Sequence, residues 1–446
     1  MEPIQFVALL IFLVTIGLII WGKIDRAVIG IIGAALMVLF GVMKEGEAFF
    51  FVDWNVIAIL FGIWIIAVYF GKSGIPQYFA ITMLRVSRHN IALFLTLLGI
   101  ISAFISMFVD NVVVILMMAP VVLHVTGRMK LASFPFLIFV GLSANFMGTA
   151  LLLGDLPPQM LHSVSGIEFP QFIWQMGRPS SFIILTLTYM MTALIFYQFK
   201  FKRMYTGSAI KSTAIEEMIL TKTSDHIKNK KYTGVVMAVF LATIMAMAFR
   251  QFIGLHLGFI ALTGMIALVV IMEIFREKLG SPVFEEVLGE LDWRTILFYI
   301  TLFILVGGIN HVGLIKMVAS AMAPYIQNSF ILGTTIVYWA TASIVGIVEH
   351  DAYILAFLYL IRDLAVSANI NPWPLWWVVL WAGTLGSNLT IAGAPALLVA
   401  QNICEKRDSC KIGLKQFFSY TIPFVAISLL ICFVLTLIIW VIPFTV

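Results

Sequence analysis

The sequence predicts an all-α polytopic membrane protein built from an inverted repeat, with about ten spans, two re-entrant hairpins and two broken helices. Three observations lead to this fold class. Of the 446 residues, 62% are hydrophobic and only 11% are charged, which excludes a soluble globular protein. Apolar runs of spanning length recur along the whole chain, and the two halves match at a fixed offset. The net charge of +5 gathers on no soluble module, so no nucleic-acid partner is expected.

Twelve apolar stretches are long enough to enter a bilayer. The first lacks a small-residue cleavage site, so we expect a retained helix and not a signal peptide. The stretches are 4–21, 28–43, 55–71, 91–127, 131–163, 181–199, 235–249, 252–275, 295–315, 330–366, 373–401 and 420–443.

Two of these stretches, 91–127 and 330–366, are too long for one span and are interrupted by acids, Asp110 and Glu349. Each is a helix pair or a re-entrant hairpin, and in either case it enters and leaves on the same face. With the other ten crossing once, 22 of the 27 Lys and Arg residues fall on one side. The positive-inside rule makes that side cytoplasmic, so both termini are predicted outside the cell (inner) membrane.

The polar stretch 200–232 is the long connection near the middle of the chain. We expect a solvated cytoplasmic linker between a first half, 1–199, and a second half, 233–446; a regulatory site is the alternative.

The halves are related by a shift of 239 residues. The shift superposes Asp110 on Glu349 and Asn111 on His350, at the two interruptions. The predicted topology runs the two copies in opposite directions, so the repeat is inverted. Other superposed pairs are Asp53-Trp54 with Asp292-Trp293, Gly74 with Gly313, Ala103 with Ala342, Val109 with Val348, Pro135 with Pro374 and Gly154 with Gly393.

A second break follows in each half, at the predicted broken helices 131–163 and 373–401. Gly and Pro unwind a helix there, and oxygens beside the exposed carbonyls suit Na+ or a hydroxylated substrate. Gly-rich packing faces are the alternative. Inverted repeats with interrupted segments are typical of secondary transporters with a site near the membrane midplane. The polar candidates are Asn145, Thr149, Asp155, Ser387, Asn388 and Thr390.

The charges of this centre favour cations. No Lys or Arg is expected at mid-membrane. Four acids are expected there or near it: Asp110, Asp155, Glu349 and Asp351. Such a site repels an anion unless cations bind first, so cation exchange or a neutral hydroxylated substrate is favoured. His350 is the candidate proton carrier, and a histidine hydrogen-bonding across helices is the alternative. No metal site beyond transported Na+, no enzymatic activity and no cofactor beyond the coupling ions H+ and/or Na+ is expected.

The segments "FVDNVVVILMMAPV", "ANFMGTALLLGDLPPQM", "DWRTILFYITLFILVGGINHVGLI" and "LGSNLTIAGAPALLVAQ" resemble the ion transporter superfamily. This superfamily includes arsenite permeases, D-type sodium/proton antiporters, the pink-eyed protein, silicon effluxers and, more distantly, citrate and dicarboxylate carriers. The resemblance implies hairpins from opposite faces, a scaffold and a transport domain, a homodimer and elevator-like movement. It implies that Asp110 and Asn111 tip the inner hairpin, and Glu349 and His350 the outer. In place of a second Asp-Asn, this chain has Glu-His-Asp.

The leading hypothesis is a proton-coupled antiporter that exports a small inorganic solute, with Na+ or arsenite, a neutral oxyacid, as candidates. The alternative is sodium- or proton-coupled uptake of an anion such as citrate or a dicarboxylate. A channel is disfavoured because paired breaks provide gates on both sides. Besides the solute, membrane lipid is the expected partner.

Overall fold

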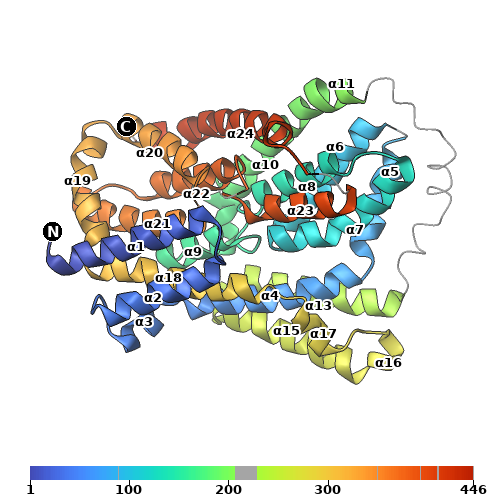
Figure 1. Ribbon diagram of the computed structural model, residues 1–446, viewed down its shortest axis with the longest axis horizontal. Coiled ribbons are helices and arrows are strands. Elements are labelled where there is room, and N and C mark those ends of the chain that lie inside the picture. The colour runs from blue at the N-terminus through green and yellow to red at the C-terminus, as the bar shows by residue number, and fades with distance from the viewer. Residues whose placement is uncertain (89, 206–228, 349, 392, 409–410, 445–446) are drawn as a thin grey trace.

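The computed structural model describes residues 1–88, 90–205, 229–348, 350–391, 393–408 and 411–444. The fold is α-helical, as predicted, and β1 and β2 form a small antiparallel hairpin (Figure 1). Most of the predicted linker 200–232, and the predicted site residue Glu349, lie outside the described residues.

The elements of the first half follow the predicted stretches, with short additional helices between them. They are α1 (Pro3–Trp21), α2 (Arg26–Leu39), α3 (Glu45–Phe51), α4 (Trp54–Lys72), α5 (Ile75–Val86), α6 (Ile91–Ser106), α7 (Asn111–Met129), α8 (Phe134–Met147), α9 (Leu156–Ser165), η1 (Phe169–Phe172), β1 (Trp174–Gln175), β2 (Arg178–Pro179), α10 (Ser181–Phe196), η2 (Tyr197–Phe201) and α11 (Lys202–Met204).

The second half repeats the order of the long helices, and its described residues form no β-hairpin. Its elements are α13 (Lys230–Ala248), α14 (Arg250–Ile253), α15 (Leu257–Ile274), α16 (Arg276–Leu279), α17 (Phe284–Gly289), α18 (Trp293–His311), α19 (Leu314–Asn328), α20 (Phe330–Val345), α21 (His350–Ala368), α22 (Trp373–Ser387), α23 (Pro395–Asp408), α24 (Leu414–Thr436), η4 (Leu437–Val441) and η5 (Ile442–Phe444).

The structure confirms the internal repeat. The 239-residue shift carries α4 onto α18, α6 onto α20 and α7 onto α21 with no change of bounds. Local hydrogen bonds repeat as well: Asp53 caps α4 by accepting from the amide of Val56, and its equivalent Asp292 caps α18. Because a carboxylate at the N-cap satisfies an amide that the helix leaves open, the same residue fixes the same helix start in both copies.

Each predicted hairpin is a pair of helices that meet at a short turn. α6 and α20 have 16 residues each, about 24 Å of helix, which is less than the hydrocarbon thickness of about 30 Å. The breaks lie between α8 and α9, and between α22 and α23. The chain therefore turns back inside the molecule at both hairpins.

The helices pack as two groups. The scaffold group contains α1, α2, α4, α13, α15 and α18, with α4 against α15 and α2 against α18. The core group contains α6 to α10 and α20 to α24, with α6 against α8 and α20 against α22. Small residues bring the scaffold helices close: a side chain at Gly30 would meet Thr301, and one at Gly62 would meet Ala261.

The two ends of the long axis differ. In Figure 1, both termini and α19 lie at one end, the terminal end, while α5, α11 and α16 lie at the other, the α5 end. Because α5 and α19 are repeat equivalents, their opposite positions show that the repeat is inverted. The apolar-run criterion does not predict these two helices, because their apolar residues alternate with polar ones.

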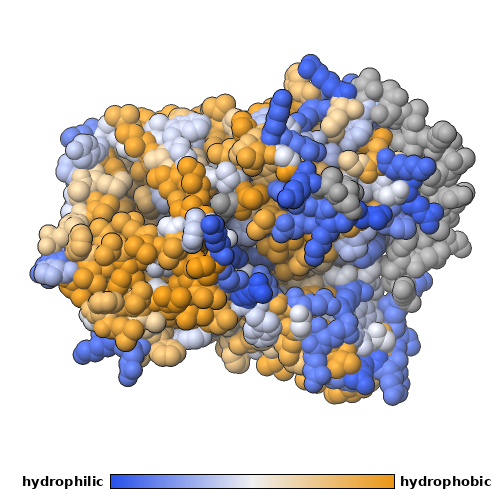
Figure 2. Space-filling model, in the orientation of Figure 1, coloured by the Kyte–Doolittle hydropathy of each residue, from blue (hydrophilic) through white to orange (hydrophobic). Residues whose placement is uncertain are grey.

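Eight helices of the described part are long and apolar enough to cross a membrane. Figure 2 shows a mostly apolar face toward the terminal end and hydrophilic residues gathered toward the α5 end. Exposed apolar side chains such as Phe6, Leu10 and Leu13 of α1 have the placement expected next to lipid. The chain is an integral, multi-pass membrane protein.

Candidate functional site

The tip of the first hairpin holds a carboxylate at the start of a helix. Asp110 is the N-cap of α7 and accepts hydrogen bonds from the amides of Val112 (2.9 Å) and Val113 (3.3 Å). The side chain is 6% exposed. Since helix N-termini carry a partial positive charge, the turn that reverses the chain also stabilises the buried acid.

Asn111 connects this tip to the first broken helix. Its amide nitrogen donates to Asn145 Oδ1 at 2.7 Å and to Asp155 Oδ2 at 3.1 Å. Asn145 is in the last turns of α8, and Asp155 is the N-cap of α9. The three side chains therefore join a hairpin tip to both ends of a helix break.

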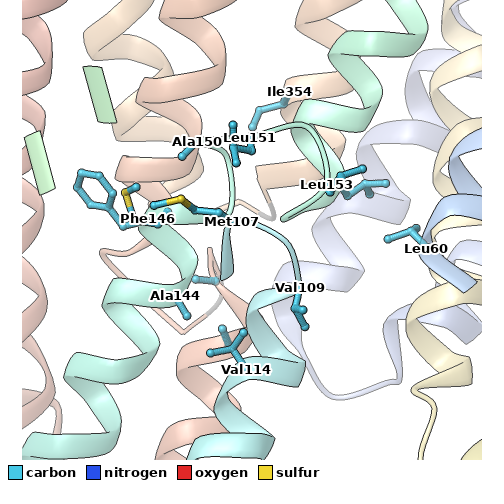
Figure 3. Packing of buried hydrophobic residues seen from close by; sticks show 14 of the residues in the cluster. Leu60, Met107, Val109, Val114, Ala144, Phe146, Ala150, Leu151, Leu153 and Ile354 are labelled. Carbon is cyan, nitrogen blue, oxygen red and sulfur yellow. The ribbon is translucent and has the colours of Figure 1, made fainter. Parts of the chain in front are cut away.

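The chain at the break passes very close to the tip. A Cβ atom on Gly154 would lie 2.2 Å from the carbonyl oxygen of Ser106 and 2.4 Å from that of Gly148, so only glycine fits there. Figure 3 shows Met107 and Val109 at the tip among apolar side chains of the break, such as Leu151, and of the neighbouring helices, such as Phe146 of α8. Gly393 makes the same approach to Val345 in the second half.

The two breaks meet where the halves cross. Asn145 donates to the carbonyl oxygen of Thr384 at 3.5 Å and to Ser387 Oγ at 3.0 Å. Asn145 and Thr384 are equivalent under the 239-residue shift, so this contact lies near the pseudo-twofold axis that relates the halves. A continuous polar chain thus runs from Asp155 through Asn111 and Asn145 to Ser387.

At the second hairpin, His350 and Asp351 begin α21. Both side chains are buried, and His350 Nε2 lies 3.3 Å from Asp351 Oδ1. Thr390, in the second break, donates to the carbonyl oxygen of Gly346 at 2.7 Å. This bond ties the second break to the second hairpin.

Thr149 and Asn388 are repeat equivalents in the two breaks. Both residues are fully buried. Thr149 Oγ1 and both polar atoms of the Asn388 side chain have no hydrogen-bond partner in the described part of the chain. Each such atom costs about 1–3 kcal/mol if it stays unpaired, so a ligand that pairs with it is stabilised.

A cavity of about 290 Å³ lies between the two helix groups. Five of the predicted residues line it: Asp110, Asn111, Asp155, His350 and Asp351. The other described candidates are not among the residues that line it; they are Asn145, Thr149, Ser387, Asn388 and Thr390. The structure therefore gathers acids from both halves around one space.

Basic side chains also line this cavity. Arg26, the first residue of α2, lines the same cavity. Arg26 is one of the 22 basic residues predicted on the cytoplasmic side, because it follows the polar residues between two apolar stretches. A cation is disfavoured at the start of a helix, and this position is the sequence signal that could have identified Arg26 as a site residue. Other lining residues not predicted for the site include Trp64, Lys72, Asp292, Thr295 and Tyr299.

The cavity reaches the α5 end of the molecule. Lys72 and Glu290, at its rim, form a salt bridge of 2.6 Å with partly exposed side chains. Gly71, Lys72 and Gln77 also line a neighbouring hollow of about 600 Å³.

Further contacts connect the two helix groups on the other side of the centre. There α9 packs on α4, and the Ser163 hydroxyl donates to the Asp53 carboxylate. Arg250 pairs with Glu168 through two hydrogen bonds of 2.6 and 2.8 Å.

Comparison with known proteins agrees with this architecture. An uncharacterised transporter of Mycobacterium tuberculosis is 25% identical over 406 residues, 90% of each chain. An uncharacterised transporter of Synechocystis is 20% identical over 439 residues, 94% of each chain. The P protein of Homo sapiens is 23% identical over 488 aligned positions, which cover 92% of this chain and 57% of the P protein. The expected resemblance to the ion transporter superfamily is confirmed.

The family model described as citrate transporter matches residues 16–382, which is most of the chain. The match includes the scaffold helices from α2 onward, both hairpins and the first break. The chain therefore belongs to the citrate transporter family and is a membrane transporter.

Proposed function

We propose that the protein is a proton-coupled antiporter that exports a small inorganic solute by alternating access, with Na+ and arsenite as the candidate solutes. The observation that carries the proposal is the lining of the central cavity, where Asp110, Asp155 and Asp351 surround one space beside His350. Carboxylates bind either protons or cations, and a histidine titrates near neutral pH. The same groups are therefore suited to hold proton and solute in turn.

Electrostatic repulsion supports the exchange of protons for a cation over independent transport of the two. Two unit charges 4 Å apart repel by about 4 kcal/mol at an effective dielectric constant of 20. A cation and the protons it replaces therefore exclude each other from a site of this size. The cavity of about 290 Å³ holds a partly hydrated Na+ or a molecule of arsenous acid with room for water.

The buried polar atoms at the breaks support an oxygen-coordinated or hydroxylated solute. Thr149 Oγ1 and the Asn388 side chain offer a hydroxyl and an amide at equivalent positions of the two halves. Na+ prefers such hard oxygen ligands, and arsenous acid both donates and accepts hydrogen bonds. Either solute pairs with atoms that otherwise stay unsatisfied.

The asymmetry of the contacts supports alternating access. The cavity opens at the α5 end, while Asp53 with Ser163 and Glu168 with Arg250 connect the two groups on the other side. In an inverted repeat, exchanging the conformations of the halves gives the opposite opening. We propose an elevator-like shift of the core group against the scaffold group, with the α5 end on the cytoplasmic side of the inner membrane and both termini outside.

A proteoliposome assay tests the proposal. The purified chain is reconstituted with a pH-sensitive dye inside, a pH gradient is imposed, and Na+, arsenite or citrate is added in turn. We expect one inorganic solute to move protons in the wild type, and Asp110→Asn and Glu349→Gln to reduce the rate at least about 100-fold. Glu45→Gln, at an exposed acid of α3, is the control. Proton movement that survives both substitutions contradicts the acidic-site mechanism.

A second candidate function is sodium- or proton-coupled uptake of a carboxylate such as citrate. The specific observation in its favour is Arg26, a cation within the central cavity, and the family description agrees. Cations bound at the acids and this guanidinium together offset the charge of the anion. Labelled citrate uptake that requires Na+ or a proton gradient, with no proton movement on adding an inorganic solute, replaces the antiporter with this function.

A further inference from the structure

Arg26 carries a positive charge at a helix N-terminus, where the helix dipole disfavours a cation. It is the first residue of α2, directly after the N-cap Asp25. A cation at a helix N-terminus is disfavoured by the helix dipole, so the position has to be stabilised by something outside the helix.

The scaffold group supplies that stabilisation. The guanidinium donates to Thr295 Oγ1 at 2.8 Å and lies over the Phe298 ring, 4.8 Å from its centroid. Thr295 Oγ1 in turn donates to the Asp292 carboxylate at 2.6 Å. All three partners belong to α18 or its N-cap. The charge is therefore fixed to the scaffold group.

The acids that share the cavity with this charge belong to the core group. Asp110, Asp155 and Asp351 are on α7, α9 and α21 or at their N-caps, and all three line the cavity with Arg26. A movement of the core group along the scaffold group changes the separation of these charges.

The register of α2 and α15 against the repeat-equivalent helices α18 and α4 identifies the counterpart of Arg26. In α2, Gly30 lies four residues after Arg26 and packs on Thr301 of α18. The repeat equivalent of Thr301 is Gly62 of α4. Gly62 packs on Ala261, which lies four residues after Leu257 in α15. This register makes Leu257, which is fully buried, the counterpart of Arg26. The repeat is therefore symmetric in backbone and asymmetric in charge at this position.

We propose that Arg26 is a counter-cation held by the scaffold group, which balances the core-group acids while the cavity is open at the α5 end. It weakens cation binding at that end and holds the empty carrier in this position. When the cavity opens at the terminal end, the acids face Leu257 and bind a cation more tightly. The inference deepens the proposed function, because it rests on the alternating access described there.

Cysteine labelling in buffer free of transported ions tests the effect on the empty carrier. The native cysteines are replaced by alanine, and one reporter is introduced on α7 or α21. Leu116→Cys lines the present cavity, and Ala356→Cys is the repeat equivalent of the cavity residue Met117. An impermeant maleimide is applied to inside-out or right-side-out vesicles.

We expect Arg26→Gln to slow labelling of the Leu116 reporter from the α5 end and to speed labelling of the Ala356 reporter from the terminal end at least about fivefold. Arg26→Lys, which keeps the charge, stays within about twofold of the parent. Arg294→Gln removes an exposed arginine of the same region, whose 3.4 Å pair with Asp25 is mostly solvated, and is the matched control.

Ion affinity gives the second readout. Arg26→Gln is expected to lower the half-saturating Na+ concentration at the α5 end roughly tenfold and to leave that at the terminal end within twofold, as removal of a nearby charge predicts. Unchanged labelling rates overturn the inference, and unchanged rates with a raised KM for citrate make Arg26 an anion-binding residue. The labelling experiment needs no transported ion. If the wild-type protein exchanges no Na+ for protons, the proposed function is contradicted, but the inference about Arg26 can still be tested by labelling.

Discussion

At the scale of single residues, polarity inside an apolar run was the useful signal. Asp110 and Asp155 were predictable because an acid in a bilayer costs several kcal/mol unless it is sheltered, and the structure brings both to one cavity. Arg26 was not predictable in the same way, since it follows a polar loop and only the packing of α2 on α18 brings it to the acids.

The unpaired hydroxyl of Thr149 leads to a prediction in which stability and binding change in opposite directions. Thr149→Val removes a buried polar atom that has no partner among the described residues, so the thermal stability of the empty protein is expected to stay level or rise slightly. The affinity for the transported solute is expected to fall about tenfold, because one ligand is lost. Thermal melting in detergent and solute titration measure the two effects.

Thr192→Val is the matched control for this prediction. Thr192 is equally buried, but its hydroxyl donates to the carbonyl oxygen of Thr188 within α10. We expect no change in solute affinity for this variant. Equal effects of the two substitutions on affinity count against a ligand role for Thr149.

At the scale of elements, the sequence was sufficient to locate both hairpins and both breaks. Runs too long for one span and clusters of Gly and Pro leave little choice of helix boundary, and the bounds of α6, α7, α20 and α21 agree with the expectation. The contacts between the breaks were not predictable, because the approach of Asn145 to Thr384 depends on how the two halves cross. Spacing along the chain does not determine that crossing.

Gly154→Ala is predicted to disturb the first hairpin tip. The added methyl group meets two carbonyl oxygens, so the tip or the break has to move, at a cost of about 1–3 kcal/mol. A lower melting temperature and slower transport are expected. Gly17→Ala, in α1 with nothing near the added atom, should stay level or gain stability. An unchanged melting temperature for Gly154→Ala disagrees with the packing described.

At the scale of the whole molecule, the repeat explains the architecture. Side chains that differ between the two halves make the two ends of the molecule chemically different. The 239-residue shift and the opposite positions of α5 and α19 make the two ends of the molecule equivalent in backbone (Figure 1). The side chains are not equivalent, as Arg26 and its counterpart Leu257 illustrate. The equivalence of the backbone was predictable from the sequence match between the halves. The difference in side chains was not, because it depends on how α2 packs on α18 and α15 packs on α4.

Cross-linking tests the movement between the groups. Asp53→Cys with Ser163→Cys joins α4 to α9, whose side chains are in contact, so oxidation is expected to stop transport and a reductant to restore it. The repeat-equivalent pair, Asp292→Cys with Asn402→Cys, should cross-link only when the cavity opens at the terminal end. Full transport by the oxidised Asp53–Ser163 pair would falsify the movement of these two groups.

The most direct test of the central claim, that one set of acids holds proton and solute in turn, is proton release on solute binding. Na+ or arsenite is added to the purified protein in weakly buffered detergent solution, and the pH is followed. The account predicts that one of these solutes releases about one or two protons per chain, and that the release is lost in Asp110→Asn. Saturable solute binding with no proton release would contradict it.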